Sequence, residues 1–562
     1  MSDKMELLDA RRLTGPNLLL NSAGTIIDVC CTTAEADRLI PLWESHISAI
    51  LQRLGWQFET LAYRQFKAGV SLAFSAPIDA LYAATSINEW AFASCEAKIN
   101  RTAAPDFDQQ FDMIINAIKE EANEPLLALE AAAKLHNVEL LWDDDHVSIG
   151  LGSGSTTWPC REIPDVSTIN WSDYHNVPVG MVTGTNGKTT TVRMARQIMR
   201  AANLNVGISS TEWIAVNDRI IDRGDWSGPG GARQALRQQE VDVGILETAR
   251  GGLLRRGLGV ATVNAAVITN VSEDHLGDFA SQSIDELLDI KWVVSRAVST
   301  GGVLILNADD ERLVYKSVNY SGAIAWFSLD ANNPIIAEHT GAGGLAYVLQ
   351  EDRLVRIKGN EYQNLCNSID IPIVLGGAAR HNIANALAAA ALTEQLGAAP
   401  DDIRTGLISM SRDDNPGRAN HYVVNDATVI VDFAHNPAAM RAVLDMSRAV
   451  PAKRRLLSFG QAGDRPDDLI RDLARHAWSI GLDAVNISEL AHYHRGRNHG
   501  EVYTVIRDEL LRCGAREDQI QYFEEETDAL DAALHWAEPG DMIIMLALDS
   551  STQIQQTLRA ME

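Results

Sequence analysis

A glycine turn between an apolar run and a helical pattern constrains the fold of this chain more than any other segment. The sequence reads VPVGMVTG, typical of a buried strand, then TNGKTT, then a helical pattern that continues through VRMARQIMRAAN. Backbone N–H groups in such a turn converge on phosphate oxygens, and the helix N-terminus adds positive potential. The segment therefore predicts a nucleotide-phosphate site made by Gly184, Thr185, Asn186, Gly187, Lys188, Thr189 and Thr190.

Two side chains of this loop have distinct expected roles. In loops of this kind the lysine, here Lys188, reaches the β- and γ-phosphates, and the hydroxyl after it, here Thr189, ligates Mg²⁺. The strict Walker pattern has a glycine five residues before Gly187, where this chain has Val182. The loop is thus a variant. A turn that only links strand to helix is the alternative, and the strand–loop–helix context disfavours it.

The rest of the chain after residue 177 indicates parallel sheets. VDVGILET, AAVITN and GGVLILNADD are short apolar runs that end in polar residues, with helical segments between them. TVIVDFAHNP, RRLLSFGQAGD, LDAVNISEL and DMIIMLALD predict four strands of a second, smaller α/β unit. The alanine-rich HNIANALAAAALTEQLGAAP predicts a helix that closes the central domain.

The first 150 residues mix strand and helix patterns and contain no catalytic motif. Residues 114–135 predict a helix interrupted at Pro125, two short strands follow, and residues 150–164 suggest a linker. The expected fold class is multidomain α/β: an α+β N-terminal domain (1–160), a P-loop-containing parallel-sheet central domain (170–410) and a smaller Rossmann-like C-terminal domain (411–562).

Composition narrows the possible partners. The chain has 562 residues, enough for three or four domains, and a net charge of −27, which argues against a nucleic-acid partner. The six cysteines are scattered, so neither a zinc site nor a disulfide framework is expected. The N-terminus has no apolar signal region, and no apolar run approaches the roughly 18 residues that span a bilayer. We expect a cytoplasmic protein without a membrane partner.

Polar residues also follow the other predicted strands of the central domain. Glu247, in VGILETARGG, suits a hard cation that takes oxygen ligands, although an ion pair with a nearby arginine is the alternative. His275, in NVSEDHLG, could ligate a second metal ion, although a lone histidine is usually structural. Lys291 lies in a predicted helix, where a lysine is ordinarily solvated.

The predicted C-terminal domain carries further candidates on loops after its strands. NPGR is a turn that presents Arg418, and DFAHNP ends a strand. Arginine forks suit carboxylates or phosphates, and the polar loop 492–501 favours a binding role over packing, with a solvated loop as the alternative. The candidate residues for substrate binding are His435, Asp464, Arg465, Arg495, Arg497 and Glu501.

Together these motifs resemble the Mur ligase family, which includes folylpolyglutamate synthetases and the C-terminal half of cyanophycin synthetases. The resemblance runs from about residue 175 to near the C-terminus and rests on TGTNGKTT, ETARGG, NVSEDHLG, NADD, RHNIANA, NPGR and DFAHNP, in that order. GDWSGPGGARQAL, GDR and RGR..GE resemble cyanophycin synthetases in particular, as do LLDARRLTGPNLL and INEWAF before residue 100. In those enzymes an ATP-grasp domain separates the two regions, whereas about 25 residues separate them here.

The resemblance implies an ADP-forming ligase that uses ATP and Mg²⁺ and forms an amide or isopeptide bond through an acyl phosphate. It implies amino-acid and acidic-peptide substrates, with arginine as the analogous amine, a homo-oligomer, and a separate ATP-grasp ligase as a partner in the same pathway. A folate-type or cell-wall peptide ligase, a non-catalytic nucleotide-binding partner of an ATP-grasp enzyme and a motion-driving NTPase are the alternatives.

The resemblance also implies roles for individual residues. Lys188, Lys291 and His275 would be catalytic, and Lys291 occupies the position where many members carry a carbamylated lysine. The metal ligands would be Thr189 and Glu247 for one ion and His275 for a second. The nucleotide contacts beyond the loop would be Asn382 to adenine, Arg418 to phosphates and Asp432 to ribose.

Overall fold

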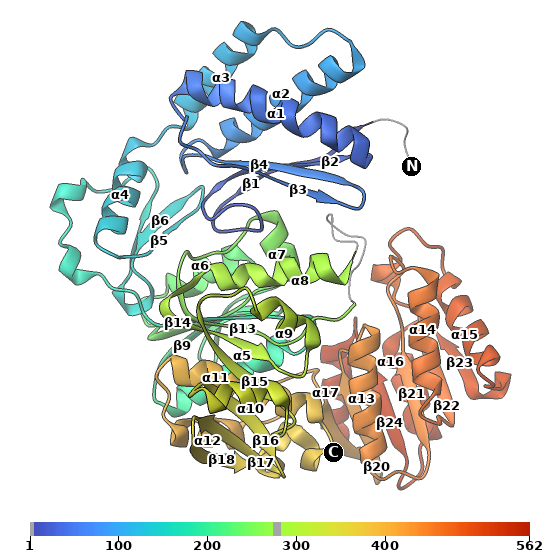
Figure 1. Ribbon diagram of the computed structural model, residues 1–562. Coiled ribbons are helices and arrows are strands. Elements are labelled where there is room, and N and C mark those ends of the chain that lie inside the picture. Colours follow the sequence, from blue (N-terminus) through green and yellow to red (C-terminus); the bar gives the residue numbers. More distant parts are fainter. Residues whose placement is uncertain (1–4, 274–282) are drawn as a thin grey trace.

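The computed structural model describes residues 5–273 and 283–562, which form an N-terminal region, a large central domain and a C-terminal domain (Figure 1). The N-terminal sheet is antiparallel, with strand order β1-β2-β4-β3, and two long helices cover one of its faces. Trp43, fully buried, donates from its indole Nε1 to Asn88 Oδ1 at 2.8 Å and so joins those helices. The elements are β1 (Glu6–Leu13), β2 (Gly24–Cys30), α1 (Thr33–Leu54), β3 (Leu61–Phe66), β4 (Gly69–Ser75) and α2 (Leu81–Asn100).

The predicted interrupted helix is two helices, α3 (Phe107–Glu121) and α4 (Glu124–Leu135). Asn123 caps α4, because its side chain accepts from the Leu126 N–H at 3.1 Å, and Pro125 lies in the first turn, where its missing N–H costs no helical bond. The two predicted short strands are confirmed as β5 (Leu140–Trp142) and β6 (His146–Ile149).

The linker prediction for residues 150–164 is wrong. The segment contains β7 (Thr156–Pro159), which pairs with β6, and its glycines pack against the start of the central domain. A Cβ on Gly154 would lie 2.3 Å from the carbonyl oxygen of His175, so a side chain has no room there. These glycines supply close backbone contact, not flexibility.

The central domain is built on an 11-stranded sheet with order β11-β10-β9-β12-β8-β13-β14-β15-β16-β17-β18. The seven strands from β9 to β16 in this order are parallel, which confirms the predicted parallel core. At each edge two further strands are added, each paired antiparallel with its inner neighbour. Its strands are β8 (Val179–Thr183), β9 (Val206–Ser209), β10 (Trp213–Val216), β11 (Arg219–Arg223), β12 (Val243–Glu247), β13 (Val263–Ile268), β14 (Val298–Asn307), β15 (Ala323–Ser328), β16 (Leu345–Gln350), β17 (Arg353–Lys358) and β18 (Glu361–Asn367).

Helices cover both faces of the central sheet and bury two apolar cores. One face packs against α5 (Lys188–Ala201), α11 (Arg380–Gln395) and α12 (Pro400–Ser409). The other packs against α6 (Pro229–Leu236), α7 (Arg250–Arg255), α8 (Ile284–Trp292), α9 (Glu311–Ser317) and α10 (Pro334–Gly341). The predicted alanine-rich helix is α11.

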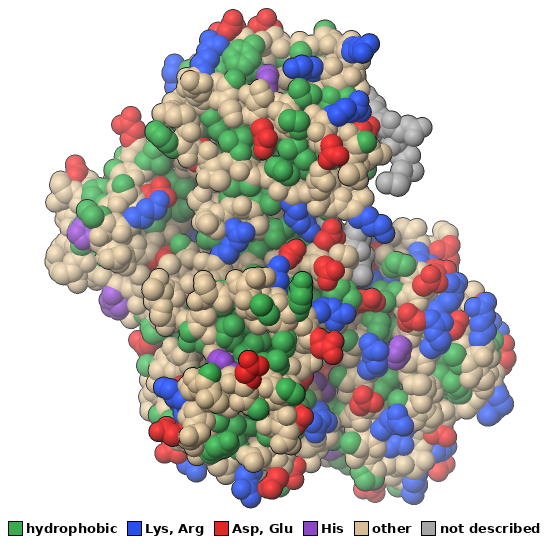
Figure 2. Space-filling model, viewed as in Figure 1, with side chains coloured by type: hydrophobic (Ala, Val, Ile, Leu, Met, Phe, Trp, Pro, Cys, Tyr) green, Lys and Arg blue, Asp and Glu red, His purple; other side chains and the backbone are tan. Residues whose placement is uncertain are grey.

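The C-terminal domain has a six-stranded sheet with order β19-β20-β24-β21-β22-β23, parallel except for β19. The four predicted strands are confirmed as β20 (Ala427–Asp432), β21 (Arg455–Phe459), β22 (Ala484–Ser488) and β24 (Met542–Leu546), and β19 (Asn420–Val424) and β23 (Ile520–Phe523) add to them. Its helices are α13 (Pro437–Ala449), α14 (Asp467–Trp478), α15 (Glu501–Arg512), α16 (Glu526–Trp536) and α17 (Ser551–Met561). Acidic and basic side chains intermingle over its visible surface (Figure 2).

Within the described residues no helix combines the length and apolar character needed to cross a bilayer. All six cysteines are free thiols, as their scattered positions predict. The carboxyl ends of β8 and β12, and that of β20 in the other domain, all reach one cleft between the central and C-terminal domains.

Candidate active site

The cleft between the central and C-terminal domains has a volume of about 1460 Å³. Both domains line it, because the phosphate loop and β12 reach it from one side and the start of the C-terminal domain from the other. It gathers many of the residues predicted from sequence: Thr185, Asn186, Gly187, Lys188, Thr189, Thr190, Glu247, Asn382, Arg418, Asp432 and His435.

The phosphate loop needs glycine at two positions. Gly184 and Gly187 have φ angles of 151° and 85°, and a Cβ would lie 1.9 Å from Thr269 Oγ1 at the first and 2.2 Å from Asn385 Oδ1 at the second. Helix α5 begins directly after Gly187 and has no side-chain cap. The N–H groups of its first turn are therefore available to an anion in the cleft.

Two lysines meet the start of this loop. Lys188 Nζ donates to the carbonyl oxygens of Gly184 at 3.0 Å and Thr185 at 2.9 Å. Lys291, which is only 3% exposed, donates from Nζ to the same Gly184 oxygen at 2.7 Å. Lys291 thus lies behind the loop and supports it from α8, whereas Lys188 lines the cleft.

Thr189 and Glu247 form a pair beneath the loop. Thr189 Oγ1 donates to Glu247 Oε2 at 3.0 Å, and the Thr211 N–H donates to the same oxygen at 3.3 Å. Glu247 Oε1 is buried and has no hydrogen-bond partner among the described residues. Burial raises the pKa of Glu247, while the charge of Lys188 and the Thr189 hydrogen bond act in the opposite direction.

This pair fits a magnesium ion. A carboxylate oxygen that lacks a partner, beside a hydroxyl and under a phosphate loop, is the hard-oxygen donor set that Mg²⁺ takes together with phosphate and water. Within residues 5–273 and 283–562 no three His, Cys, Asp or Glu side chains gather into a metal centre. His275, the predicted ligand of a second ion, lies outside the described residues.

The predicted nucleotide contacts line the cleft but already have protein partners. Asn382 is 1% exposed and donates from Nδ2 to the Ile373 carbonyl oxygen at 2.8 Å. Asp432, at the end of β20, accepts from the Ala419 N–H at 2.7 Å. Burial raises the pKa of Asp432, and the nearby Arg418 charge opposes that effect.

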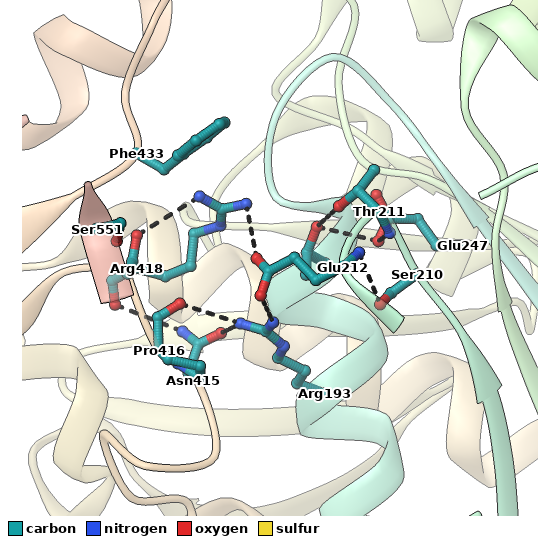
Figure 3. A network of polar contacts seen from close by, with 12 residues as sticks. Arg193, Ser210, Thr211, Glu212, Glu247, Asn415, Pro416, Arg418, Phe433 and Ser551 are labelled. Atoms are coloured by element: carbon teal, nitrogen blue, oxygen red, sulfur yellow. Dashed lines mark hydrogen bonds and ion pairs between the residues drawn. The ribbon is translucent and has the colours of Figure 1, made fainter. Parts of the chain in front are cut away.

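Sequence reasoning missed the contacts that join the two domains across the cleft. Asn186 and Asn436 exchange hydrogen bonds between their amides, at 2.9 and 3.3 Å. Figure 3 shows a second junction, in which Glu212 lies between the guanidinium groups of Arg193 and Arg418. No motif marks these pairs, because their members lie between 19 and 250 residues apart in the sequence.

Four predicted substrate residues (Asp464, Arg465, Arg495 and Arg497) lie on the loops after β21 and β22, and a fifth, Glu501, begins α15. None of the five is among the described residues that line the cleft. Arg495 forms an ion pair with Asp464, and Arg497 donates from Nε to the Gly463 carbonyl oxygen at 2.8 Å. Two hydrogen-bond contacts link these loops to residues that line the cleft. His492 Nδ1 lies 2.8 Å from Asp549 Oδ2, and Gln461 Nε2 donates to the His435 carbonyl oxygen at 3.2 Å. Their role in substrate binding stays a prediction.

Family models match both domains that form the cleft. The Mur ligase middle domain matches residues 182–393, and the "Mur ligase, glutamate ligase domain" matches residues 417–547. Cyanophycin synthetases from Crocosphaera subtropica and Geminocystis herdmanii are 33% and 35% identical over 371 and 373 residues, covering 66% of this chain and 42% of each relative. The chain therefore spans less than half the length of these relatives.

The chain is also similar to a second kind of ligase and to a solved structure. A UDP-N-acetylmuramoyl-L-alanyl-D-glutamate–2,6-diaminopimelate ligase from Caldanaerobacter subterraneus is 24% identical over 441 residues, which are 76% of this chain and 85% of that enzyme. The structure of E. coli FolC in complex with DHPP and ADP superimposes with a TM-score of 0.51 at 19% identity, covering 68% of this chain and 89% of that one. This structural likeness shows the fold alone.

Proposed function

Because its central and C-terminal domains belong to the Mur ligase family, we propose that this chain is an ATP-dependent ligase that joins a carboxylate to an amine. Mur ligases use ATP. The observation that carries the proposal is the pairing of Thr189 with Glu247, whose second carboxylate oxygen is buried without a partner beneath the phosphate loop. That arrangement suits the metal-bound triphosphate of ATP.

The proposed reaction has two steps. The carboxylate attacks the γ-phosphorus of ATP, so that a P–O bond forms to the acid while the bond to ADP breaks. The amine then attacks the acyl carbon, loses a proton, and displaces inorganic phosphate as the C–N bond forms. The first step converts a poor electrophile into an acyl group with a good leaving group.

The side chains of the cleft divide this work between them. Lys188 and the uncapped N–H groups of α5 offset the negative charge of the phosphates. Thr189 and Glu247 would hold Mg²⁺, which when bound neutralises charge on the phosphoryl group in transfer. The Asn186–Asn436 amide pair holds the C-terminal domain against the loop, and such closure keeps water from the reactive acyl phosphate.

The relatives support a proposal for the substrate class. Likeness to cyanophycin synthetases and to a glutamate ligase domain supports an amino acid as one substrate and an acidic amino acid or peptide as the other. We favour a cationic, arginine-like amine and an aspartyl acceptor, with a separate ATP-grasp ligase supplying or extending the acceptor. A cell-wall peptide ligase is the second candidate, favoured by the 85% coverage of the diaminopimelate ligase.

Phosphate release from ATP and Mg²⁺ tests the proposal, with amino acids added singly and then paired with acidic peptides, and with products read by mass spectrometry. We expect release only when an acid and an amine are both present, together with a condensed product. Release with neither would indicate an NTPase, and ATP binding without release for any pair would indicate a non-catalytic partner protein. Lys188→Ala is the control, and it should lower the rate by about 100-fold or more because the phosphates lose their lysine.

A further inference from the structure

Arg193 is a buried cation on the helix that begins at the phosphate loop. Its side chain has no exposed surface, and its guanidinium stacks 4.6 Å from the centre of the Trp213 ring. A buried charge needs an opposite charge and hydrogen-bond acceptors. Glu212 Oε2 supplies the first at 2.7 Å, and the turn that opens the C-terminal domain supplies acceptors at 3.3 Å, Asn415 Oδ1 and the Pro416 carbonyl oxygen.

The other carboxylate oxygen of Glu212 faces the cleft. It lies 3.4 Å from Arg418 Nη2, a longer contact than the one with Arg193 (Figure 3). The Arg418 guanidinium lies 4.4 Å from the centre of the Phe433 ring, so Glu212 and Phe433 together restrict its position. Arg418 Nη1 also makes a long contact of 3.5 Å with the Gly417 carbonyl oxygen. The guanidinium has five N–H groups, so others can still bind an anion in the cleft.

The backbone that carries Glu212 is tied to the metal-binding pair. Ser210 Oγ accepts from the N–H groups of Glu212 and Trp213 at 3.3 and 3.2 Å. The Thr211 N–H donates to Glu247 Oε2 at 3.3 Å, and the Thr211 hydroxyl lies 3.4 Å from that of Thr189. In the turn after β9, Thr211 therefore contacts the metal-binding pair, and the next residue, Glu212, contacts both Arg193 and Arg418.

We propose that Glu212 is a positioning residue that holds Arg418 toward the phosphates of the nucleotide while neutralising Arg193 at the junction of the two domains. This role rests on the proposed nucleotide-dependent function. Arg418 belongs to the C-terminal domain, so Glu212 also couples the placement of that domain to the phosphate loop. An unrestrained arginine side chain loses conformational entropy when it binds phosphate. A carboxylate that already restricts the side chain lowers this entropic cost of binding.

Binding of the nonhydrolysable analogue AMPPNP with Mg²⁺, measured by calorimetry, tests this role without the ligase reaction. Glu212→Gln keeps an oxygen for Arg193 but removes the charge, and we expect a Kd about five- to tenfold higher. Glu212→Asp retains the charge for the buried Arg193 but shortens the reach to Arg418, so it should weaken binding with little change in melting temperature. The matched control is Glu240→Gln, at an exposed ion pair with Arg219, which should bind as the wild type does.

A double-mutant cycle separates positioning from general structural support. If Glu212 acts through Arg418, Glu212→Gln should weaken binding no further in the Arg418→Ala background. Additive losses, or a Kd within twofold of the wild type for both Glu212 variants, would overturn the positioning role alone. A wild-type chain that binds no AMPPNP would overturn the proposed function, and this inference with it.

Discussion

The nucleotide cleft and the loops after β21 and β22 both carry conspicuous charged residues, but the cleft keeps a few polar groups without protein partners at the phosphate loop, whereas the arginines of the loops are paired. In the cleft, Glu247 Oε1 has no partner among the described residues and the first turn of α5 has no side-chain cap. In the loops, Arg495 pairs with Asp464, and Arg497 Nη1 lies 2.7 Å from Asp467 Oδ1. Polar groups that are held in place without hydrogen-bond partners indicate a binding site. The same residue types, when paired with one another, hold two loops together.

The comparison predicts its largest effect at Glu247. Glu247→Gln keeps the shape but removes the metal-binding charge, so we expect ligase activity to fall by about 100-fold and to need more Mg²⁺. The same substitution should increase the stability of the folded protein at neutral pH. Because burial raises the pKa of Glu247, the ionised side chain costs stability as the pH rises above 4.5, its ordinary value, through the raised pKa.

Thermal melts over a pH series measure that cost. Glu247→Gln should melt at a higher temperature than the wild type at neutral pH, and the gain should vanish below pH 4.5. The control is Glu538→Gln. Glu538 is an exposed carboxylate in an ion pair with Arg454, so its substitution should not raise the melting temperature at neutral pH. Equal melting curves for Glu247→Gln and the wild type would show that the Glu247 carboxylate is satisfied, against the comparison.

A smaller effect is expected at Arg497, where the sequence alone predicts substrate binding. Its guanidinium donates to the carbonyl oxygens of Gly463 and Arg465, at 2.8 and 2.7 Å, besides its pair with Asp467. Arg497→Ala should therefore lower the free energy of unfolding by about 1–3 kcal/mol while the KM of each substrate changes less than threefold. Urea unfolding and steady-state kinetics measure the two quantities.

The matched control for Arg497 is Arg516→Ala. Arg516 forms an exposed ion pair with Asp518, so this substitution should leave the free energy of unfolding nearly unchanged. A tenfold rise in the KM of one substrate, with unfolding unchanged, would instead support the prediction that Arg497 binds substrate. It would also break the contrast between the two regions.

The smallest effect concerns His499, which pairs with Glu524 at 2.8 Å on the exposed side of the loops. The hydrogen bond and charge of Glu524 raise the pKa of His499 above 6.5. A raised histidine pKa stabilises the folded state at low pH, and this contribution is lost as the pH rises from 6.5 through the raised value. His499→Gln should lower the melting temperature slightly at pH 6 and not at pH 9; an equal change at both would contradict the pairing.

The sequence predicts the parts of this molecule whose signals are local. The strand–loop–helix around Lys188, the position of Glu247 at a strand end beside that loop, and the C-terminal strands β20, β21, β22 and β24 follow from short patterns. Strands β9 to β11 and β15 to β18 were missed, because no chemical motif marks those parts of the central sheet. The glycines of residues 150–154 were misinterpreted as a linker, since sequence does not show the His175 backbone that packs against them.

The contacts missed at the site depend on residues that are distant in the sequence. Glu212 contacts Arg418 across 206 residues, and Asn186 contacts Asn436 across 250. Asn186 and Arg418 belong to motifs, but no motif predicts which side chain each of them contacts. Conversely, the composition of the loop 492–501 predicts a binding role. In the fold, however, Arg495 and Arg497 pair with Asp464 and Asp467, which are about 30 residues away in the sequence.

The complete burial of Arg193 also bears on how such a chain can evolve by exchanging modules. Its acceptors come from both sides of the domain boundary, Glu212 from one and the Asn415–Pro416 turn from the other. A C-terminal domain borrowed from a relative would leave this cation short of acceptors unless it brought an equivalent turn. The junction acts as a compatibility requirement that restricts which halves can be recombined, however freely the substrate loops themselves diverge.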